Sequence, residues 1–401
     1  MGQAADFTEA GSETLGTALR RHVDAGTIAG AVGMVARGAA VQFEVAGMRE
    51  LGGVEPMRRD TIFRVASMTK PVTAVALLML VEDGRLRLDD PIANWLPELE
   101  RPRVLRSIDA AIDDTVPAQR AISVRDLLAF TAGFGAIMAP PGRYPIQAAI
   151  AAAGIGPGPD PLPFASTEFI RRLAALPLLC QPGEQWLYHT GSDVLGALIE
   201  RVSGRSFDQF LQERIFAPLG MLDTAFSVPA SKRERLAGCY RRDAVTGELA
   251  VYAPGSTAFL QPPAFQSGGG GLVSTADDFL AFGRMLLNGG RHNGQQLLGR
   301  ATIELMTRDQ LTPRQKAASP FYTGFWDTHG WGFGVAVTTQ ASPLGLAPGS
   351  FGWDGGFGTS WYCDPGKDAV LILLTQLAMT APDSAHVNRE FLGNACRALA
   401  R

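Results

Sequence analysis

The chain has few lysines and few cysteines, and each shortage narrows the chemistry it can use. Only four of its 401 residues are lysines, and only four are cysteines. The cysteines are scattered and form no Cys-x-x-Cys pair, which argues against a zinc site or a disulfide framework. We expect reduced thiols in a cytoplasmic protein, at positions Cys180, Cys239, Cys363 and Cys396.

The chain also lacks a strong net charge and a long apolar run. Its formal net charge is −3, with acidic and basic residues interspersed, so neither nucleic acid nor an anionic membrane is an expected partner. No run of about 18 apolar residues predicts a membrane span. Residues 1–7 have neither the basic nor the apolar region of a signal peptide, so we expect no export.

What the chain does have is the composition of a globular protein with a large core. Hydrophobic residues make up 46% and charged residues 19%. Helical patterns and Pro/Gly-rich loops fill the middle of the chain, including a loop-rich segment at 103–163. Helices are also expected at 13–25 and 383–399. Strand-like runs lie near both ends, at 29–36, 41–45, 61–66, 332–339, 358–363 and 369–375.

This order of elements predicts an α+β fold in which the two ends of the chain build one sheet. We expect a sheet domain formed by 1–66 and 265–401. A mainly helical domain would be inserted between them at 67–264.

Ser67-Met68-Thr69-Lys70 is the strongest chemical signal, and it is the only Ser-x-x-Lys in the sequence. Residues three apart on a helix share a face, so the amine of Lys70 is expected beside the hydroxyl of Ser67. A desolvated lysine can take the proton of a serine hydroxyl and make it a nucleophile. The free N–H groups at a helix start also favour developing negative charge. The alternative is that Ser67 caps a helix and Lys70 is an ordinary solvated residue.

Tyr188 is a second candidate, because it lies in a turn before a predicted helix. A phenol beside a lysine ammonium can have a lowered pKa and relay protons. The alternative is a capping or core tyrosine. His189 invites a Ser-His-Asp hypothesis, but in an extended turn beside Tyr188 its side chain is expected to point away. The chain contains no Gly-x-Ser-x-Gly nucleophile elbow, which weakens an α/β-hydrolase hypothesis.

The third candidate is the glycine-rich segment 351–361, which contains Trp353-Asp354-Gly355-Gly356. Glycines in a strand mark a close approach of another group to the backbone. An edge strand without bulky side chains could offer a backbone N–H to an oxyanion. The alternative is a glycine-rich hairpin with two stacking tryptophans.

In this order and with these spacers, the three sites resemble the serine β-lactamase and penicillin-binding superfamily. They look most like its class C-like branch, which includes the family VIII carboxylesterases. The resemblance spans about 15–395 and includes the supporting stretches 63–70, 127–133, 182–184, 267–272 and 275–278. It implies a β-lactamase/transpeptidase-like fold, with an antiparallel sheet flanked by helices and an inserted, mainly helical domain.

The resemblance also implies two-step acyl transfer through an acyl-enzyme, with no metal or organic cofactor. Ser67 would be the nucleophile and Lys70 its base. Tyr188 would assist acylation and protonate the leaving group. The backbone N–H groups of Ser67 and Gly356 would form the oxyanion hole.

Two motifs depart from the β-lactamase pattern of this branch. Its Tyr-x-Asn is Tyr188-His189-Thr190 here, and Thr190 has no carboxamide to offer. Its Lys-Thr-Gly is Trp353-Asp354-Gly355 here, so the ammonium that pairs with a substrate carboxylate is missing and Asp354 would repel an anion. We therefore expect a small-molecule ester substrate, contacted by Thr190, Trp353, Asp354 and Gly355.

The favoured hypothesis is a cytoplasmic serine esterase for small or medium neutral esters, with 103–163 shaping its acyl pocket. Three alternatives stay open at this point. They are a β-lactamase or D,D-peptidase with relaxed motifs, an acyltransferase of the same superfamily, and a non-catalytic binding protein on the same fold. The sequence leaves open the natural substrate, its stereochemistry and the oligomeric state.

Overall fold

The computed structural model describes residues 7, 9–158, 160–253 and 259–399. The expectation that the chain has no signal peptide is based on residues 1–7, and 1–6 of these lie outside the described residues. Within the described ranges, no helix is long and apolar enough to cross a membrane.

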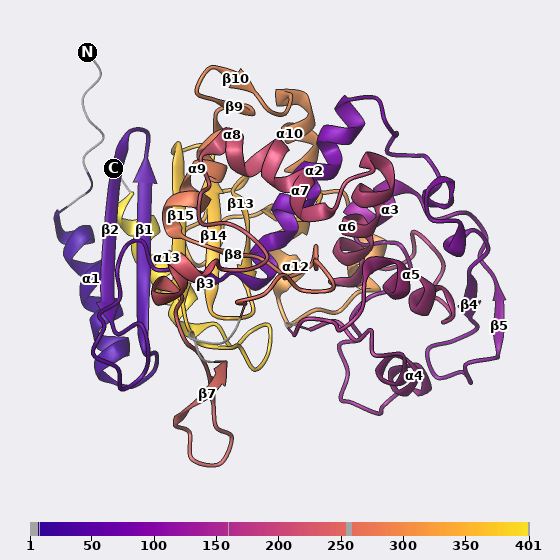
Figure 1. Ribbon diagram of the computed structural model, residues 1–401, viewed down its shortest axis with the longest axis horizontal. Coiled ribbons are helices and arrows are strands. Elements are labelled where there is room, and N and C mark those ends of the chain that lie inside the picture. The colour runs from indigo at the N-terminus through magenta and orange to yellow at the C-terminus, as the bar shows by residue number, and fades with distance from the viewer. Residues whose placement is uncertain (1–6, 8, 159, 254–258, 400–401) are drawn as a thin grey trace.

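Both ends of the chain build one seven-stranded sheet, which lies on one side of the molecule, at the left in Figure 1. The strand order is β11-β12-β13-β14-β15-β1-β2, and all neighbours are antiparallel. This confirms the predicted α+β class and the antiparallel sheet. The strands are β1 (Gly30–Arg37), β2 (Ala40–Gly47), β11 (His329–Trp331), β12 (Ala336–Thr338), β13 (Phe351–Gly355), β14 (Thr359–Asp364) and β15 (Ala369–Thr375).

Two predicted strands differ from the structure. The run expected at 332–339 is a hairpin of β11 and β12, because a tight turn separates them: Gly332 N donates to Val335 O at 2.9 Å, and Gly334 has a positive φ of 71°. The run expected at 61–66 contains only β3 (Phe63–Arg64), which pairs with β8 (Val273–Ser274) outside the main sheet.

Helices cover both faces of the main sheet. On one face lie α1 (Glu9–Asp24) and α13 (His386–Ala398), and on the other lies α9 (Ala276–Leu287). Successive side chains of a strand point to opposite faces. Along β15, Leu371 therefore packs towards α1 and α13, whereas Ile372 packs towards α9. This burial on both sides explains why β15 is a continuous apolar run.

A mainly helical region lies beside the sheet, with α2 at its centre (Figure 1). All residues of α2 from Thr69 to Leu80 are buried, so the helix packs on every side. It ends before Gly84, whose φ of 68° makes a left-handed turn that favours glycine. The helices of this region are α2 (Thr69–Glu82), α3 (Val124–Leu128), α4 (Pro145–Ala153), α5 (Ser166–Ala174), α6 (Thr190–Ser203), α7 (Phe207–Leu211) and α8 (Ala217–Leu219).

Short elements complete the chain. The helices α10 (Arg300–Met306), α11 (Pro313–Ala317) and α12 (Phe325–Thr328) lie between α9 and β11 in the sequence. Single 3₁₀ or π-helical turns cover Ala66–Met68, Ile92–Asn94, Pro97–Leu99, Gln212–Phe216 and Ala230–Arg235. The remaining strands form two-residue to five-residue pairs: β4 (Arg103–Leu105) with β5 (Thr115–Pro117), β6 (Cys239–Arg242) with β7 (Leu249–Ala253), and β9 (Arg291–His292) with β10 (Gln295–Gln296).

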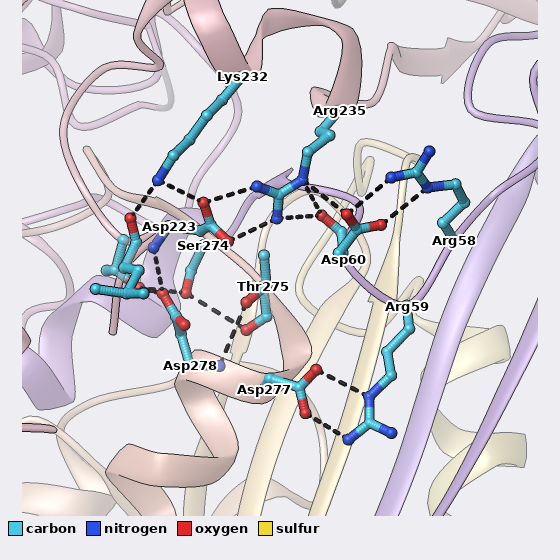
Figure 2. Close-up of polar contacts among 12 residues, drawn as sticks. Arg58, Arg59, Asp60, Asp223, Lys232, Arg235, Ser274, Thr275, Asp277 and Asp278 are labelled. Carbon is cyan, nitrogen blue, oxygen red and sulfur yellow. Dashed lines mark hydrogen bonds and ion pairs between the residues drawn. The ribbon is translucent and has the colours of Figure 1, made fainter. Parts of the chain in front are cut away.

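A network of charged side chains ties three distant segments together (Figure 2). Arg235 lies between Asp60 and Asp223: its guanidinium donates to both carboxylate oxygens of Asp223, at 2.9 and 2.6 Å, and to Asp60 O, at 2.9 and 2.6 Å. Asp278, in the first turn of α9, accepts the N–H of Asp223 at 2.9 Å and the hydroxyl of Thr224 at 2.7 Å. The network thus fixes the ends of the β3 and β8 segments, which lead to the site described next.

Candidate active site

Ser67 and Lys70 lie together at the start of the buried helix α2. Ser67 lies in the 3₁₀ turn Ala66–Met68, and α2 follows from Thr69. Lys70 Nζ is 3.0 Å from Ser67 Oγ, as the three-residue spacing predicts. Ala66 has a φ of 44°, a left-handed conformation that is costly for a residue with a Cβ. Thr69 Oγ1 holds this turn by donating to Ala66 O at 2.7 Å, which leaves the Ser67 side chain half-buried beside a cavity.

The amine of Lys70 is completely buried among polar acceptors. Its Nζ donates to Gly269 O at 2.6 Å, lies 3.1 Å from His189 Nδ1, and sits 4.5 Å from the centroid of the Tyr188 ring. Burial lowers the pKa of Lys70 to about 7, although the negative charge of Asp193 raises it. A large fraction of these amines is therefore neutral near pH 7 and able to accept a proton.

The expectation that the His189 side chain points away from the site is wrong. His189 has φ 80° and ψ −68°, and Thr190 N donates to Tyr188 O at 3.2 Å. These are the features of a γ-turn of the rarer, strained kind. In an extended turn neighbouring side chains diverge, but in this γ-turn the imidazole reaches Lys70 while the Tyr188 ring also faces it.

Asp193 lies behind His189 and completes a buried chain of polar groups. Its Oδ2 is 3.3 Å from His189 Nε2, and its Oδ1 accepts Ser267 Oγ at 2.6 Å and Gly269 N at 3.0 Å. Burial and the charge of Lys70 lower the pKa of His189, so the imidazole is neutral. Burial would raise the pKa of Asp193, but His189, Ser267 and Lys70 outweigh it and the pKa is lowered. We assign the imidazole proton to Nε2, facing the carboxylate, which leaves Nδ1 to accept from Lys70.

Sequence reasoning missed Asp193. The one signal in the sequence is that Asp193 follows His189 by four residues, in the first turn of α6, and the γ-turn at His189 then brings the two side chains together.

Tyr188 reaches the site, but its pKa moves opposite to the expected direction. Burial raises the pKa of the phenol well above its usual range, and hydrogen bonds with Ser67 and Trp353 offset this only in part. Trp353 Nε1 donates to the Tyr188 oxygen at 2.7 Å. Because burial outweighs these hydrogen bonds, the phenol stays protonated and is suited to donate a proton.

The end of β13 lies close to the backbone that leads into Ser67. A Cβ at Gly355 would lie 2.2 Å from Val65 O and 2.1 Å from Thr359 Oγ1, so this position has room only for glycine. Gly356 follows directly and is exposed. It lines the same cavity as Ser67, as do Trp353 and Asp354.

Tyr188 lines two cavities. The first, which we call the Ser67 cavity, has a volume of about 300 Å³, and its lining includes Ser67, Tyr188, Trp353, Asp354 and Gly356. The second, which we call the loop cavity, has a volume of about 580 Å³ and takes 104–108 and 136–139 from the loop-rich segment. Thr190 is not brought to either cavity: it is buried at the start of α6, beside a separate space of about 20 Å³.

The described residues contain no cluster of three or more His, Cys, Asp or Glu side chains arranged to hold a metal ion.

Comparisons with known proteins agree with one another. A model of the family described as Beta-lactamase matches residues 15–391. The chain is 39% identical over 366 residues to Protein Rv1367c of Mycobacterium tuberculosis, covering 89% of this chain and 88% of that protein. It is 32% identical over 373 residues to Esterase EstB of Burkholderia gladioli, covering 88% and 86%.

Solved structures show the same likeness. EstCE1, described as a hydrolase with promiscuous acyltransferase activity, has a TM-score of 0.79 and 27% identity, with 98% of this chain and 99% of that chain covered. A LovD6 mutant of simvastatin synthase from Aspergillus terreus has a TM-score of 0.80 and 25% identity, with 99% and 100% covered. The β-lactamase/transpeptidase-like fold is thereby confirmed.

Proposed function

The chain belongs to the beta-lactamase family, and on this premise we propose that it is a serine hydrolase that cleaves small or medium neutral carboxylic esters through an acyl-enzyme. The observation that carries the proposal is the 3.0 Å contact between Ser67 Oγ and a buried Lys70 Nζ. Relatives that are named as esterases or hydrolases, Esterase EstB and EstCE1, support the reaction type.

The surroundings of Lys70 orient its lone pair. A neutral amine has two N–H groups and one lone pair. Gly269 O and His189 Nδ1 each accept one N–H, so the lone pair is left to face the Ser67 hydroxyl. In this state Ser67 Oγ–H donates to Lys70, and the amine is poised as a general base.

Acylation then follows in two steps, attack on the carbonyl carbon and loss of the alcohol. Ser67 Oγ bonds to the ester carbonyl carbon while its proton passes to Lys70 Nζ, and negative charge collects on the carbonyl oxygen. We place the backbone N–H groups of Ser67 and Gly356 at that oxyanion. When the bond from carbon to the alcohol oxygen breaks, the protonated phenol of Tyr188 supplies a proton to the alcohol and recovers one from Lys70. Water then attacks the acyl carbon and gives a proton to the same amine, and Lys70 passes that proton to Ser67 Oγ as the bond from Oγ to carbon breaks and the acid leaves.

The third motif supports an ester over a β-lactam or a peptide with a free carboxylate. Trp353 stands where a lysine would pair with such a carboxylate, and its indole N–H is engaged with Tyr188. Asp354 adds a negative charge to the same cavity.

Turnover of p-nitrophenyl butyrate, nitrocefin and a D-Ala-D-Ala peptide by the purified protein tests the proposal. We expect the ester to have the highest kcat/KM. Intact-mass analysis after a fluorophosphonate probe should find one adduct, on Ser67, that is missing in Ser67→Ala. Nitrocefin or the peptide as the far better substrate, or an unlabelled Ser67, would overturn the proposal.

Acyl transfer to an alcohol is a second candidate. The observation that favours it is that Tyr188 lines two cavities. An acyl group and an acceptor alcohol would then each have a cavity beside the candidate acid. Adding an alcohol acceptor to the ester reaction and measuring the new ester by mass spectrometry tests it; hydrolysis product alone would exclude this candidate for that acceptor.

A further inference from the structure

The Ser67 cavity carries a negative charge and no positive one. Among the described residues that line it, Asp354 is the one acidic side chain, and none is a lysine or arginine. Its one histidine, His329, has a pKa lowered by burial, so this ring is neutral. The lining itself therefore offers a substrate the negative charge of Asp354 and no cation, and the amine of Lys70 and the guanidinium of Arg389 lie outside it.

The carboxylate of Asp354 has only neutral hydrogen-bond donors. Ser360 Oγ donates to Oδ1 at 2.5 Å, and the Tyr362 hydroxyl donates to Oδ2 at 3.3 Å. Each oxygen keeps a lone pair for a further donor. Burial raises the pKa of Asp354 to about 6, and Ser360, Tyr362 and the charge of Arg389 offset that only in part. At neutral pH the carboxyl group is mostly ionised. A buried carboxylate whose hydrogen-bond donors are all neutral is stabilised when a cation binds beside it.

Four aromatic rings also line this cavity. Phe321, Tyr322, Phe325 and Trp353 line the cavity and touch in sequence. Their centroids lie 5.2 Å apart for Phe321–Tyr322, 5.1 Å for Tyr322–Phe325, 6.1 Å for Phe325–Trp353 and 6.0 Å for Phe321–Trp353. The negative faces of such rings attract substituted ammonium groups.

We propose that Asp354 and these four rings form a subsite for a positively charged group of the ester substrate, such as a substituted ammonium. The inference rests on the proposed function, because it places the group in the cavity that Ser67 lines. Neutral esters remain substrates, and a cationic group adds affinity. The charge preference of the cavity is then opposite to that of a site with lysine at position 353.

Pairs of esters that differ by one charge give the test. Butyrylcholine and 3,3-dimethylbutyl butyrate have the same shape, and so do the p-nitrophenyl esters of 4-(trimethylammonio)butanoic acid and 5,5-dimethylhexanoic acid. The first pair carries the charge on the alcohol and the second on the acyl group. In at least one pair we expect kcat/KM to be about tenfold higher for the cation, since cation–π and carboxylate contacts together contribute a factor of this size. Equal values in both pairs would overturn the inference and leave the esterase proposal intact.

Two variants assign the preference to Asp354. In Asp354→Asn, whose amide can still bond to Ser360 and Tyr362, the cation-to-neutral ratio should fall to the smaller factor that the four rings alone contribute, whatever the absolute rates do. Asp383 is exposed and acts on Tyr322 from outside the cavity. Asp383→Asn, as the matched control, should keep the wild-type ratio. A ratio that is undiminished in Asp354→Asn, or that falls in Asp383→Asn alone, would contradict the assignment.

A binding measurement keeps the inference testable if no ester is turned over. Ligand-observed NMR on Ser67→Ala protein compares choline with 3,3-dimethylbutan-1-ol, which has carbon in place of the nitrogen. We expect choline to bind about tenfold more tightly, and Asp354→Asn in the same background to reduce the difference to the part that the rings contribute. Equal affinities would show that the carboxylate serves only to hold Ser360, whose Oγ also accepts Asn388 Nδ2 at 2.5 Å.

Discussion

His189 Nδ1 lies 3.1 Å from Lys70 Nζ, so the residue next to the candidate acid contacts the candidate base. The imidazole is neutral and is held from behind by Asp193. It accepts one of the two N–H groups of a neutral Lys70 and thereby helps to aim the lone pair at Ser67. His189 is a positioning residue in this proposal, because it acts through Lys70 and does not contact the reacting atoms.

Removing the imidazole should lower kcat and leave KM nearly unchanged. We expect kcat to fall about 10- to 100-fold in His189→Ala, which is the usual loss of rate when a proton acceptor is misplaced. His189→Asn should recover most of this loss, because the amide oxygen can stand near the place of Nδ1 and asparagine tolerates a positive φ. Steady-state kinetics with a p-nitrophenyl ester measure both variants. Equal losses of kcat in the two variants would mean that His189 only forms the turn and does not position Lys70.

Activity should rise with pH through about 7. The pKa of Lys70 is lowered to about 7 by burial, so the amine is protonated and inactive as a base below that pH and neutral above it. The phenol of Tyr188 keeps its proton over this range, because burial raises its pKa. We expect a single rising limb in kcat/KM, measured from pH 5 to 9. A profile that is flat over this range would contradict the assignment of Lys70 as the base.

The position of this limb should depend on Asp193. Its negative charge raises the pKa of Lys70, so Asp193→Asn should lower that pKa and move the midpoint to lower pH. Exposed Asp109 offers a control, since Asp109→Asn should leave the midpoint in place. A midpoint that moves to higher pH in Asp193→Asn would show that another effect of the carboxylate dominates.

Local spacing is enough to predict part of this site. The contact between Ser67 and Lys70 follows from three residues along a helical turn, and the arrangement of strands at the two ends follows from their apolar runs. The position of His189 could not be predicted from spacing. Neighbouring side chains usually point in different directions, but the γ-turn at His189 directs its side chain and that of Tyr188 to the same amine. The pKa of Tyr188 depends on how deeply the folded chain buries it, and no local pattern encodes that depth.

The two glycines at the end of β13 should respond differently to the same change. A Cβ on Gly355 would collide with the backbone oxygen of Val65, which cannot move without shifting the segment that carries Ser67. A Cβ added at Gly356 would have no other heavy atom within 4 Å, and an alanine at this position keeps the backbone N–H. We expect Gly355→Ala to lose at least about 100-fold in kcat/KM, within the range seen when oxyanion contacts are lost, and Gly356→Ala to lose far less. Similar losses in both would argue against a steric cause.

The ion pair of Arg235 with Asp223 should stabilise the fold more than an exposed pair does. Their side chains are 18% and 15% exposed, against 63% and 49% for Arg106 and Asp114. Arg235→Met leaves a half-buried carboxylate without its main partner, so we expect the free energy of unfolding to fall by about 2 kcal/mol. Arg106→Met, the control, should cost less than about 1 kcal/mol, because water screens that pair. Urea unfolding followed by circular dichroism measures both. Equal effects would mean that the network in Figure 2 contributes no more than surface charge.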